Sequence, residues 1–197
     1  MPPNCRFEVD DAEDPWLYSH KFDYIHLRAV STCFRSHLNV IKSAYEHTRP
    51  GGYIELQDGF LPVQCPDDSL AGTQLEEWDR KIAAAAKALG KNWQCSANYK
   101  SYVEEAGFVD VVEVKFAWPV GMWAKDPKLK LLGLWGRENF VSVLQGMSMA
   151  AMTRGLGMTP QEVEVFLAGV REEIKGRKVH CYAPITVVYG RKPESAG

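Results

Sequence analysis

The sequence predicts an α/β fold with a mostly parallel sheet, and three observations support this prediction. Two short apolar runs, residues 24–27 and 53–56, are rich in β-branched and aromatic residues and too short for helices, so we interpret them as strands. Between them apolar residues recur at steps of four, three and four, on one face of a helix: Phe34, Leu38, Ile41 and Tyr45. Residues 49–52 (RPGG) then end that helix and turn the chain. A strand, helix and strand of this length normally form a right-handed parallel crossover.

Further elements follow along the chain. A helix is expected over residues 75–89, capped by residues 67–69 and ended by Gly90, with a shorter helix around residues 99–106. Residues 108–118 alternate as a strand does. The final strand is expected over residues 185–189.

We expect a single domain over residues 1–197, with its sheet core in residues 1–118 and 179–193. Residues 119–178 are rich in methionine and helical in pattern, and residues 159–162 (TPQE) form a capping box. Near the N-terminus, residues 6–9 are a candidate for a further short strand.

Composition excludes several classes of protein. The chain is 46% hydrophobic and 24% charged with a net charge of -2, and it has no basic stripe, so direct binding of nucleic acid is not expected. No apolar run is long enough to span a bilayer, and the N-terminus lacks the pattern of a signal peptide. The five cysteines are scattered, and no pair has the spacing of metal ligands, so we expect reduced thiols, no metal, and an intracellular location in cytoplasm or nucleus.

Candidate ligand contacts follow the two predicted strands. Ligands of parallel sheets bind beyond the carboxyl ends of the strands, which indicates His26, Leu27 and Arg28 after the first strand and Gln57 and Asp58 after the second.

An acidic cluster precedes the first of these strands. Residues 10–14 contain four acids, which repel one another unless a ligand or hydrogen-bond donors offset the charge. A solvated acidic loop is the structural alternative.

Four segments together resemble a known family. They are VDDAEDPW at residues 9–16, FDYIHLR at 22–28, RPGGYIELQD at 49–58 and HCYAPITVVYGRKP at 180–193. With these segments the chain resembles the fungal LaeA-like branch of class I (Rossmann-like) S-adenosylmethionine-dependent methyltransferases. The resemblance covers essentially the whole chain but begins at the family's third strand.

The resemblance implies S-adenosyl-L-methionine as cofactor and assigns residues to it. Asp10, Asp11 and Ala12 would meet the adenine, with Asp11 accepting a hydrogen bond from the amino group and the Ala12 amide facing a ring nitrogen. His26, Leu27 and Arg28 would line the methionine moiety, since they follow the strand that the family uses for this purpose. His26 is also a candidate base for a substrate hydroxyl, with a structural role as the alternative.

The family's fold further implies an antiparallel last strand inserted between the two before it. The helical segment 119–178 would cover the substrate side, and the side chains of Trp118, Trp123 and Trp135 would form an apolar wall for the substrate. Ordinary core packing is the alternative for each of these residues.

The sequence also departs from the family. It contains no first strand followed by a glycine-rich turn and no acidic residue for the ribose, and residues 155–157 (GLG) follow a helical pattern and do not replace that turn. The domain is therefore expected to lack its N-terminal part, which would leave residues 24–27 as an exposed edge. Pairing of residues 7–9 with that edge, a homodimer through it, and a longer native protein all remain open.

Three functions remain open at this point. The first is a methyltransferase of fungal secondary metabolism or its regulation, acting on a small-molecule substrate that the sequence does not identify. The second is a catalytically inactive protein that acts through a protein partner. The third is an enzyme of the same fold with other chemistry, such as cyclisation.

Overall fold

A four-stranded mixed sheet forms the centre of the computed structural model, which describes residues 3–59 and 61–194. The strands lie in the order β1-β2-β4-β3, and β4 runs antiparallel to both of its neighbours. This confirms the inserted antiparallel last strand. Because β1 and β2 are the one parallel pair of neighbours in the described sheet, the sheet is mixed and not mostly parallel. The strands are β1 Phe22–Arg28, β2 Thr48–Gly59, β3 Val109–Pro119 and β4 Tyr182–Arg191.

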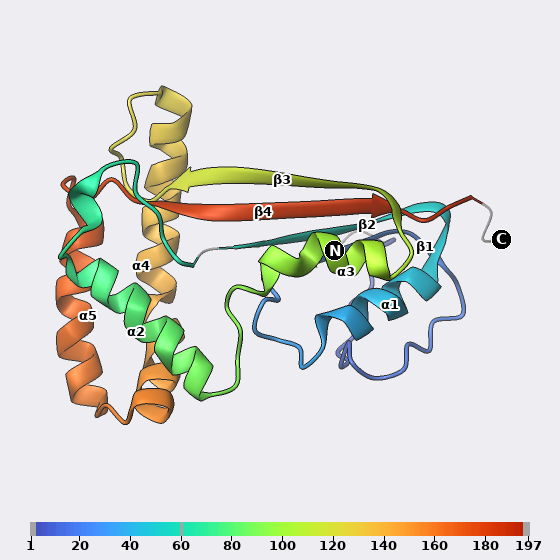
Figure 1. Cartoon of the computed structure of the whole chain (residues 1–197), viewed down its shortest axis with the longest axis horizontal. Helices are drawn as coiled ribbons and strands as arrows, with labels where there is room; N and C mark the ends of the chain where they lie inside the picture. The colour runs from blue at the N-terminus through green and yellow to red at the C-terminus, as the bar shows by residue number, and fades with distance from the viewer. Residues whose placement is uncertain (1–2, 60, 195–197) are drawn as a thin grey trace.

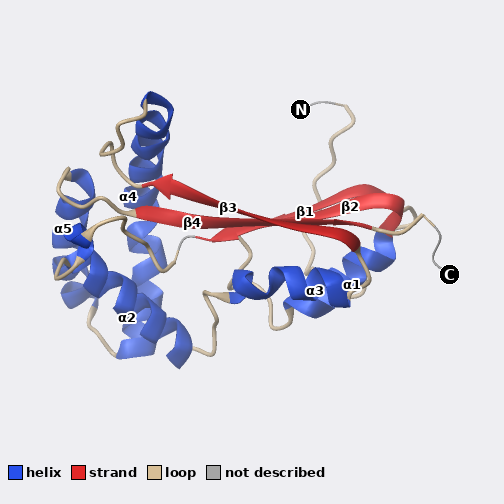
Figure 2. Cartoon of the chain, turned by 45° about the horizontal axis from the view of Figure 1, so that its top comes forward, coloured by secondary structure: helices blue, strands red, loops and turns tan. Residues whose placement is uncertain are grey.

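The helices form two groups around this sheet. Helices α2, α4 and α5 gather at one end of the strands, whereas α1 and α3 lie beneath one face (Figures 1 and 2). Within the described residues, no helix is both long and apolar enough to cross a membrane. The helices are α1 His37–His47, α2 Gln74–Ala88, α3 Tyr99–Glu105, α4 Pro127–Leu156 and α5 Pro160–Lys175.

The β1-α1-β2 unit forms as the sequence predicts. Ser36 caps α1, and the apolar face of this helix buries Ile41 and Ala44. These side chains join Ile54 and Leu56 of β2 in one core cluster, against which Leu27 of β1 also packs. Because side chains alternate along a strand, the odd-numbered positions of β1 face the helices and the even-numbered positions face away.

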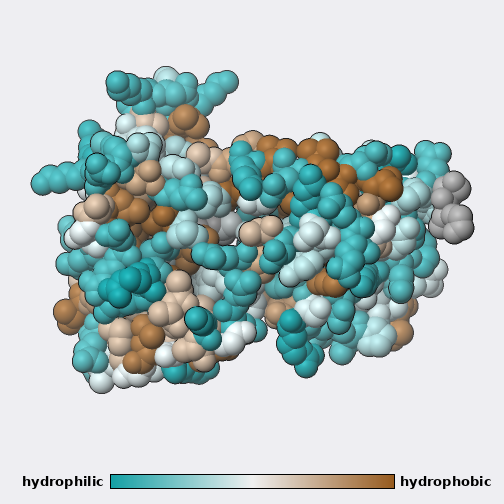
Figure 3. Space-filling view, in the orientation of Figure 1, coloured by the Kyte–Doolittle hydropathy of each residue, from teal (hydrophilic) through white to brown (hydrophobic). Residues whose placement is uncertain are grey.

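The opposite face of the sheet is largely uncovered. Tyr24, Tyr53 and Phe116 are 50%, 42% and 47% exposed, and Figure 3 shows apolar surface along β3. In the described part of the chain, β1 pairs with β2 alone, so it is an edge strand, as predicted. Pairing of two chains through this edge remains a prediction.

The second core lies among α2, α4 and α5. The rings of Trp78 on α2 and Phe140 on α4 meet edge to face with their centroids 5.1 Å apart, and both side chains are fully buried. Val163 and Leu167 of α5 complete the contact. The helical layer is therefore built from α2 as well as from the segment 119–178.

Two local predictions were wrong. Residues 6–9 form no strand, and Phe7 and Val9 are exposed because no described strand lies beside them. Asp67 caps the short 3-10 turn Asp68–Leu70, and α2 begins later, where the hydroxyl of Thr73 accepts a hydrogen bond from the Glu76 amide.

Candidate functional site

Three strands end at the same edge of the sheet. β1, β2 and β3 run in the same direction, so Arg28, Gln57 and Trp118 are all brought to the carboxyl edge. The residues that follow β3 then lead into α4, which crosses this edge (Figure 1). This is the edge at which ligands of α/β sheets bind.

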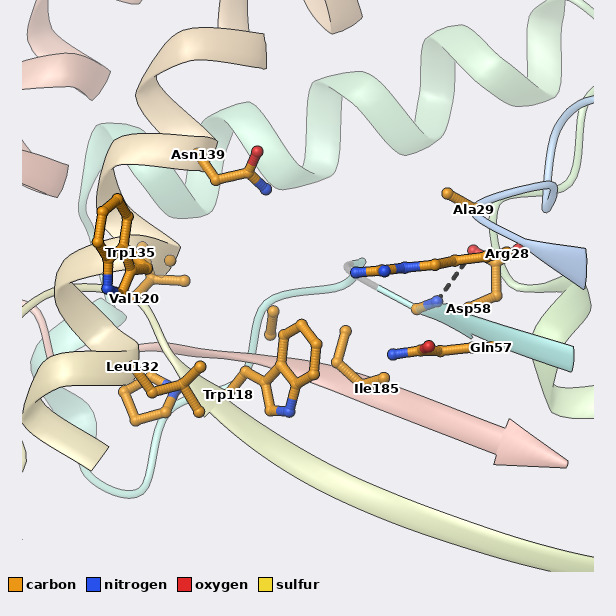
Figure 4. Close-up of a pocket in the computed structure, with 14 residues that line it drawn as sticks. Arg28, Ala29, Gln57, Asp58, Trp118, Val120, Leu132, Trp135, Asn139 and Ile185 are labelled. Atoms are coloured by element: carbon orange, nitrogen blue, oxygen red, sulfur yellow. Dashed lines mark hydrogen bonds between the residues drawn. The ribbon is translucent and has the colours of Figure 1, made fainter. Parts of the chain in front are cut away.

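A cavity of about 290 Å³ lies between this edge and α4. Two indole rings, from Trp118 on β3 and Trp135 on α4, stand on its wall, and Figure 4 shows Arg28 reaching toward it from β1. The wall is otherwise mainly aliphatic. The further apolar side chains that line it are Val120, Leu132, Ile185, Pro119 and Ala183.

Three polar side chains enter this apolar cavity from different elements. Figure 4 shows the Arg28 guanidinium, the Gln57 amide and the Asn139 amide directed into it from β1, β2 and α4. In the part of the chain that the structure describes, none of these three side chains makes a hydrogen bond or ion pair. Their donors are therefore available to a ligand.

The cavity floor is held by Asp58, whose side chain is 5% exposed. One carboxylate oxygen accepts hydrogen bonds from the Val30 amide at 2.7 Å and the Tyr99 hydroxyl at 2.9 Å, and the other accepts from the Gly59 amide at 3.0 Å. Between Arg28 and Val30, Ala29 has a φ of 56°, a conformation that costs free energy for any residue except glycine. Asp58 thus fixes the turn from which Arg28 extends.

Tyr99 links this floor to α3, beneath the sheet. Burial, and then the nearby carboxylate of Asp58, raise the pKa of Tyr99, so the phenol remains a donor. Its neighbour Cys95 is also buried, which raises the pKa of that thiol. Both groups therefore act here as neutral structural partners.

Two glycines allow α4 to reach the cavity. A Cβ on Gly133 would lie 2.0 Å from the Gly121 carbonyl oxygen, and one on Gly136 would lie 2.6 Å from that of Pro119. The Gly121 amide also donates a 2.9 Å hydrogen bond to the Gly133 carbonyl. The close approach of α4 to the end of β3 is what places Trp135 over the cavity.

The predicted adenine loop lies beside the segment that follows β1. The Glu13 carboxylate accepts hydrogen bonds from the amides of Arg35 and Ser36 at 2.9 and 3.1 Å, and it pairs with the Arg35 guanidinium. The Ser36 amide is the main cause of a lowered pKa of Glu13, against the opposing effect of desolvation. Asp10, Asp11 and Ala12 are thereby held near the N-terminus of α1.

This loop carries the two groups that are predicted to contact an adenine. One Asp11 oxygen accepts a hydrogen bond from the Glu13 amide, and the Ala12 carbonyl accepts a hydrogen bond from the indole of Trp16. Within the described residues, the second Asp11 oxygen and the Ala12 amide have no hydrogen-bond partner, so one acceptor and one donor are available to a ligand. Adenine offers the complementary pair, an amino donor beside a ring nitrogen. Gly157 ends α4, with a φ of 71°.

The three residues predicted for the methionine moiety separate in the structure. Arg28 lines the cavity, Leu27 packs against the core beneath the sheet, and His26 lies on the uncovered face. His26 Nε2 is 3.6 Å from Glu55 Oε1 on β2. The structure therefore brings one of the three to the cavity, and the role of His26 as a base remains a prediction.

The tryptophans separate in the same way. Trp118 and Trp135 line the cavity, whereas the Trp123 indole donates a hydrogen bond to the Cys181 carbonyl at 2.9 Å and packs near His180.

Sequence reasoning missed Asn139 and the role of Tyr99. Asn139 carried a signal, because it shares one helical face with Leu132, Trp135 and Gly136 at spacings of three, four and seven.

No metal centre competes with this interpretation. Among the residues that the structure describes, no group of three or more His, Cys, Asp and Glu side chains could hold a metal ion.

Comparisons with known proteins place the chain in a family. The family model for a methyltransferase domain matches residues 1–114. The probable methyltransferase tdiE of Emericella nidulans is 34% identical over 96% of this chain and 60% of its own length. The secondary metabolism regulator LAE1 of Cochliobolus heterostrophus is 30% identical over 98% of this chain and 65% of its own length.

The chain thus spans about 60% of the length of the curated relatives it matches. Among solved structures, the YcgJ protein of Bacillus subtilis aligns over 96% of this chain and 72% of its own chain. The identity is 14% and the TM-score is 0.47, a similarity too weak to add to the assignment. The domain match alone covers more than half of the sequence. The chain belongs to the methyltransferase domain family, whose members typically use S-adenosylmethionine.

Proposed function

We propose that this chain forms the acceptor-binding and adenine-contacting part of an S-adenosylmethionine-dependent methyltransferase of fungal secondary metabolism. One observation carries the proposal: in a chain of the methyltransferase domain family, an apolar cavity with three available polar side chains lies at the carboxyl edge of the sheet. The fungal relatives support the biological setting, since one is named a methyltransferase and another a regulator of secondary metabolism.

In this proposal the cofactor and the acceptor contact two different sites on the chain. Asp11 and Ala12 would hold the adenine edge of the cofactor, which when bound supplies an electrophilic methyl group. The cavity would hold the acceptor: the Trp118 and Trp135 rings form part of its apolar wall, and Arg28 and Asn139 orient its polar atoms. Methyl transfer depends mainly on proximity and alignment, so it does not require His26 to act as a base.

Calorimetric titration of S-adenosylhomocysteine into the full chain tests the cofactor part of this proposal. We expect saturable binding at a 1:1 ratio, weakened in Asp11→Asn, in which the amide oxygen still accepts from the Glu13 amide. Asp14→Asn, in the same loop, is the matched control and should bind as the parent does. Absence of heat at high protein concentration would contradict cofactor binding by this chain.

A second candidate function is a non-catalytic role through a protein partner, here a second copy of this chain. The observation that favours it is the uncovered sheet face, on which Tyr24 of β1, Tyr53 of β2 and Phe116 of β3 are exposed. Sedimentation velocity over a range of concentrations should then show a dimer that Phe116→Asp disrupts. A monomer at all concentrations would remove this candidate.

A further inference from the structure

We infer that the cavity binds its acceptor as an oxyanion, the ionised hydroxyl or carboxyl group of a compact, flat, apolar molecule, and that Arg28 pairs with the charged oxygen. The inference rests on the proposed function for the claim that this ligand is the methyl acceptor. The class of ligand itself rests on the residues of the cavity.

The charge of the cavity favours an anion. Arg28 is a cation in an otherwise mostly apolar lining and makes no ion pair with any described acid. The one acid in the lining, Asp58, already accepts from Val30, Tyr99 and Gly59. An arginine beside apolar walls, with its fork of donors unused, is suited to a carboxylate or another planar oxyanion.

The walls favour a flat ring system. Trp118 rises from β3 and Trp135 descends from α4, so that the two indoles approach the cavity from different elements (Figure 4). Aromatic side chains pack best against planar apolar surfaces. The volume of about 290 Å³ is near the lower end of the range of about 300–1,000 Å³ usual for ligand pockets, so a compact molecule fits better than a peptide.

The two amides add directional contacts elsewhere in the cavity. Gln57 on β2 and Asn139 on α4 each carry a donor and an acceptor, and both side chains point into the cavity in Figure 4. A ring that bears further oxygens offers these amides hydrogen-bond partners. The cavity thus distinguishes an oxygenated ring from a plain hydrocarbon.

This arrangement also explains how methyl transfer proceeds without a strong base. An acidic O–H group loses its proton to water as it binds, because the Arg28 guanidinium stabilises the resulting oxyanion. The oxygen lone pair then forms the new O–CH3 bond as the C–S bond of the sulfonium breaks, and its electron pair remains on sulfur. The products are the methyl ether or ester, the thioether and one proton.

The test uses two matched pairs of probes and equilibrium dialysis with the full chain. The acids are 2-naphthoate and 2-hydroxy-1,4-naphthoquinone, a carboxylate and an enolate at neutral pH. Their controls are methyl 2-naphthoate and 2-methoxy-1,4-naphthoquinone, which keep the rings but lose the charge. We expect at least one acid to bind about tenfold or more tightly than its methylated partner. Equal binding of acid and methylated partner in both pairs would overturn the inference.

Three variants identify the group responsible. Arg28→Met keeps the length and apolar stem of the side chain, and it should abolish the preference for the acid while leaving the methylated partner unchanged. Asn139→Leu should weaken the binding of the acid and of its methylated partner to the same extent, so the preference for the acid should remain. Arg177→Met, at an exposed position between α5 and β4, removes the same charge elsewhere and should change nothing. A preference for the acid that survives in Arg28→Met would contradict the role of Arg28.

The outcome separates this inference from the proposed function. Binding of S-adenosylhomocysteine with no preference for the acid would overturn the inference alone. A preference for the acid without binding of S-adenosylhomocysteine would support the oxyanion site and overturn the cofactor part of the proposed function.

Discussion

The Tyr99 hydroxyl donates a 2.9 Å hydrogen bond to the carboxylate of Asp58, and this bond joins α3 to the end of β2 beneath the cavity. Both side chains are buried, and the same carboxylate oxygen holds the Val30 amide in the turn after β1. The buried carboxylate of Asp58 therefore connects the packing of α3 beneath the sheet to the position of Arg28.

Tyr99→Phe tests this connection. Loss of the hydroxyl leaves a buried carboxylate with one donor fewer, so we expect the free energy of unfolding to fall by about 1–3 kcal/mol in urea titrations. Tyr102→Phe is the control, because the Tyr102 hydroxyl makes no hydrogen bond within the described residues. Equal losses in the two variants would mean that the bond to Asp58 contributes nothing specific.

Gly133→Ala tests the docking of α4. The added Cβ would lie 2.0 Å from the Gly121 carbonyl oxygen, so the helix must move away from the end of β3. We expect a loss of stability of about 1–3 kcal/mol, since such overpacking forces the backbone to shift. Binding of 2-naphthoate should weaken in parallel, because Trp135 would leave the cavity wall.

Gly146→Ala, in the same helix, is the matched control for that variant. Nothing lies within 4 Å of a Cβ at this position, so alanine should stabilise the helix by about 0.5–1 kcal/mol. A thermal melt that shows both alanines to be stabilising would contradict the close packing of α4.

Asp79 makes stability depend on pH. Burial raises the pKa of this carboxyl from 3.8 to about 6, with a smaller opposing effect from the Val63 amide, and its Oδ1 has no partner in the described part of the chain. Because the pKa of Asp79 is higher in the folded state, its contribution to the free energy of unfolding is greatest below pH 4. This contribution is lost as the pH rises toward 6.

Asp79→Asn should therefore stabilise the protein at pH 8 and have little effect of this kind near pH 4. After allowance for solvent screening of a partly open side chain, we expect a gain of about 1–2 kcal/mol at pH 8. Glu172→Gln, an exposed acid on α5, is the control and should show no such pH dependence. A gain that is the same at both pH values would refute the explanation through ionisation.

Much of the fold was predictable because local patterns determine it. The apolar stripe of α1 and the two flanking runs predicted the β1-α1-β2 unit, and the capping box of Thr159 and Glu162 is present at the start of α5. The prediction of a strand at residues 6–9 was wrong, because an alternating pattern alone does not supply a partner strand. The prediction that Asp67 caps α2 was wrong, because its carboxylate caps a nearer turn. The same carboxylate also contacts the His180 ring, which is far away in the sequence.

The candidate site was predictable only in part. Arg28, Gln57 and Asp58, which the rule on strand ends indicated, line the cavity together with Trp118 and Trp135, and their contact with a ligand stays a prediction. The rule could not separate His26 from Arg28, which lie on the same face of β1, because the cavity forms only at the end of the strand, where α4 crosses the sheet edge. The roles of Tyr99 and Asn139 arise from packing between distant segments, which a single sequence does not reveal.

The indole N–H signals of the six tryptophans offer the most direct measurement of the central claim, that ligands bind at the carboxyl edge of this sheet. The Trp16 indole donates to the Ala12 carbonyl, and the Trp78 indole donates to Ser148 in the core, so these two serve as reporter and control. In 15N–1H NMR titrations, S-adenosylhomocysteine should shift Trp16, 2-naphthoate should shift Trp118 and Trp135, and Trp78 should not move. Signals of Trp16, Trp118 and Trp135 that stay fixed at saturating ligand would contradict the account.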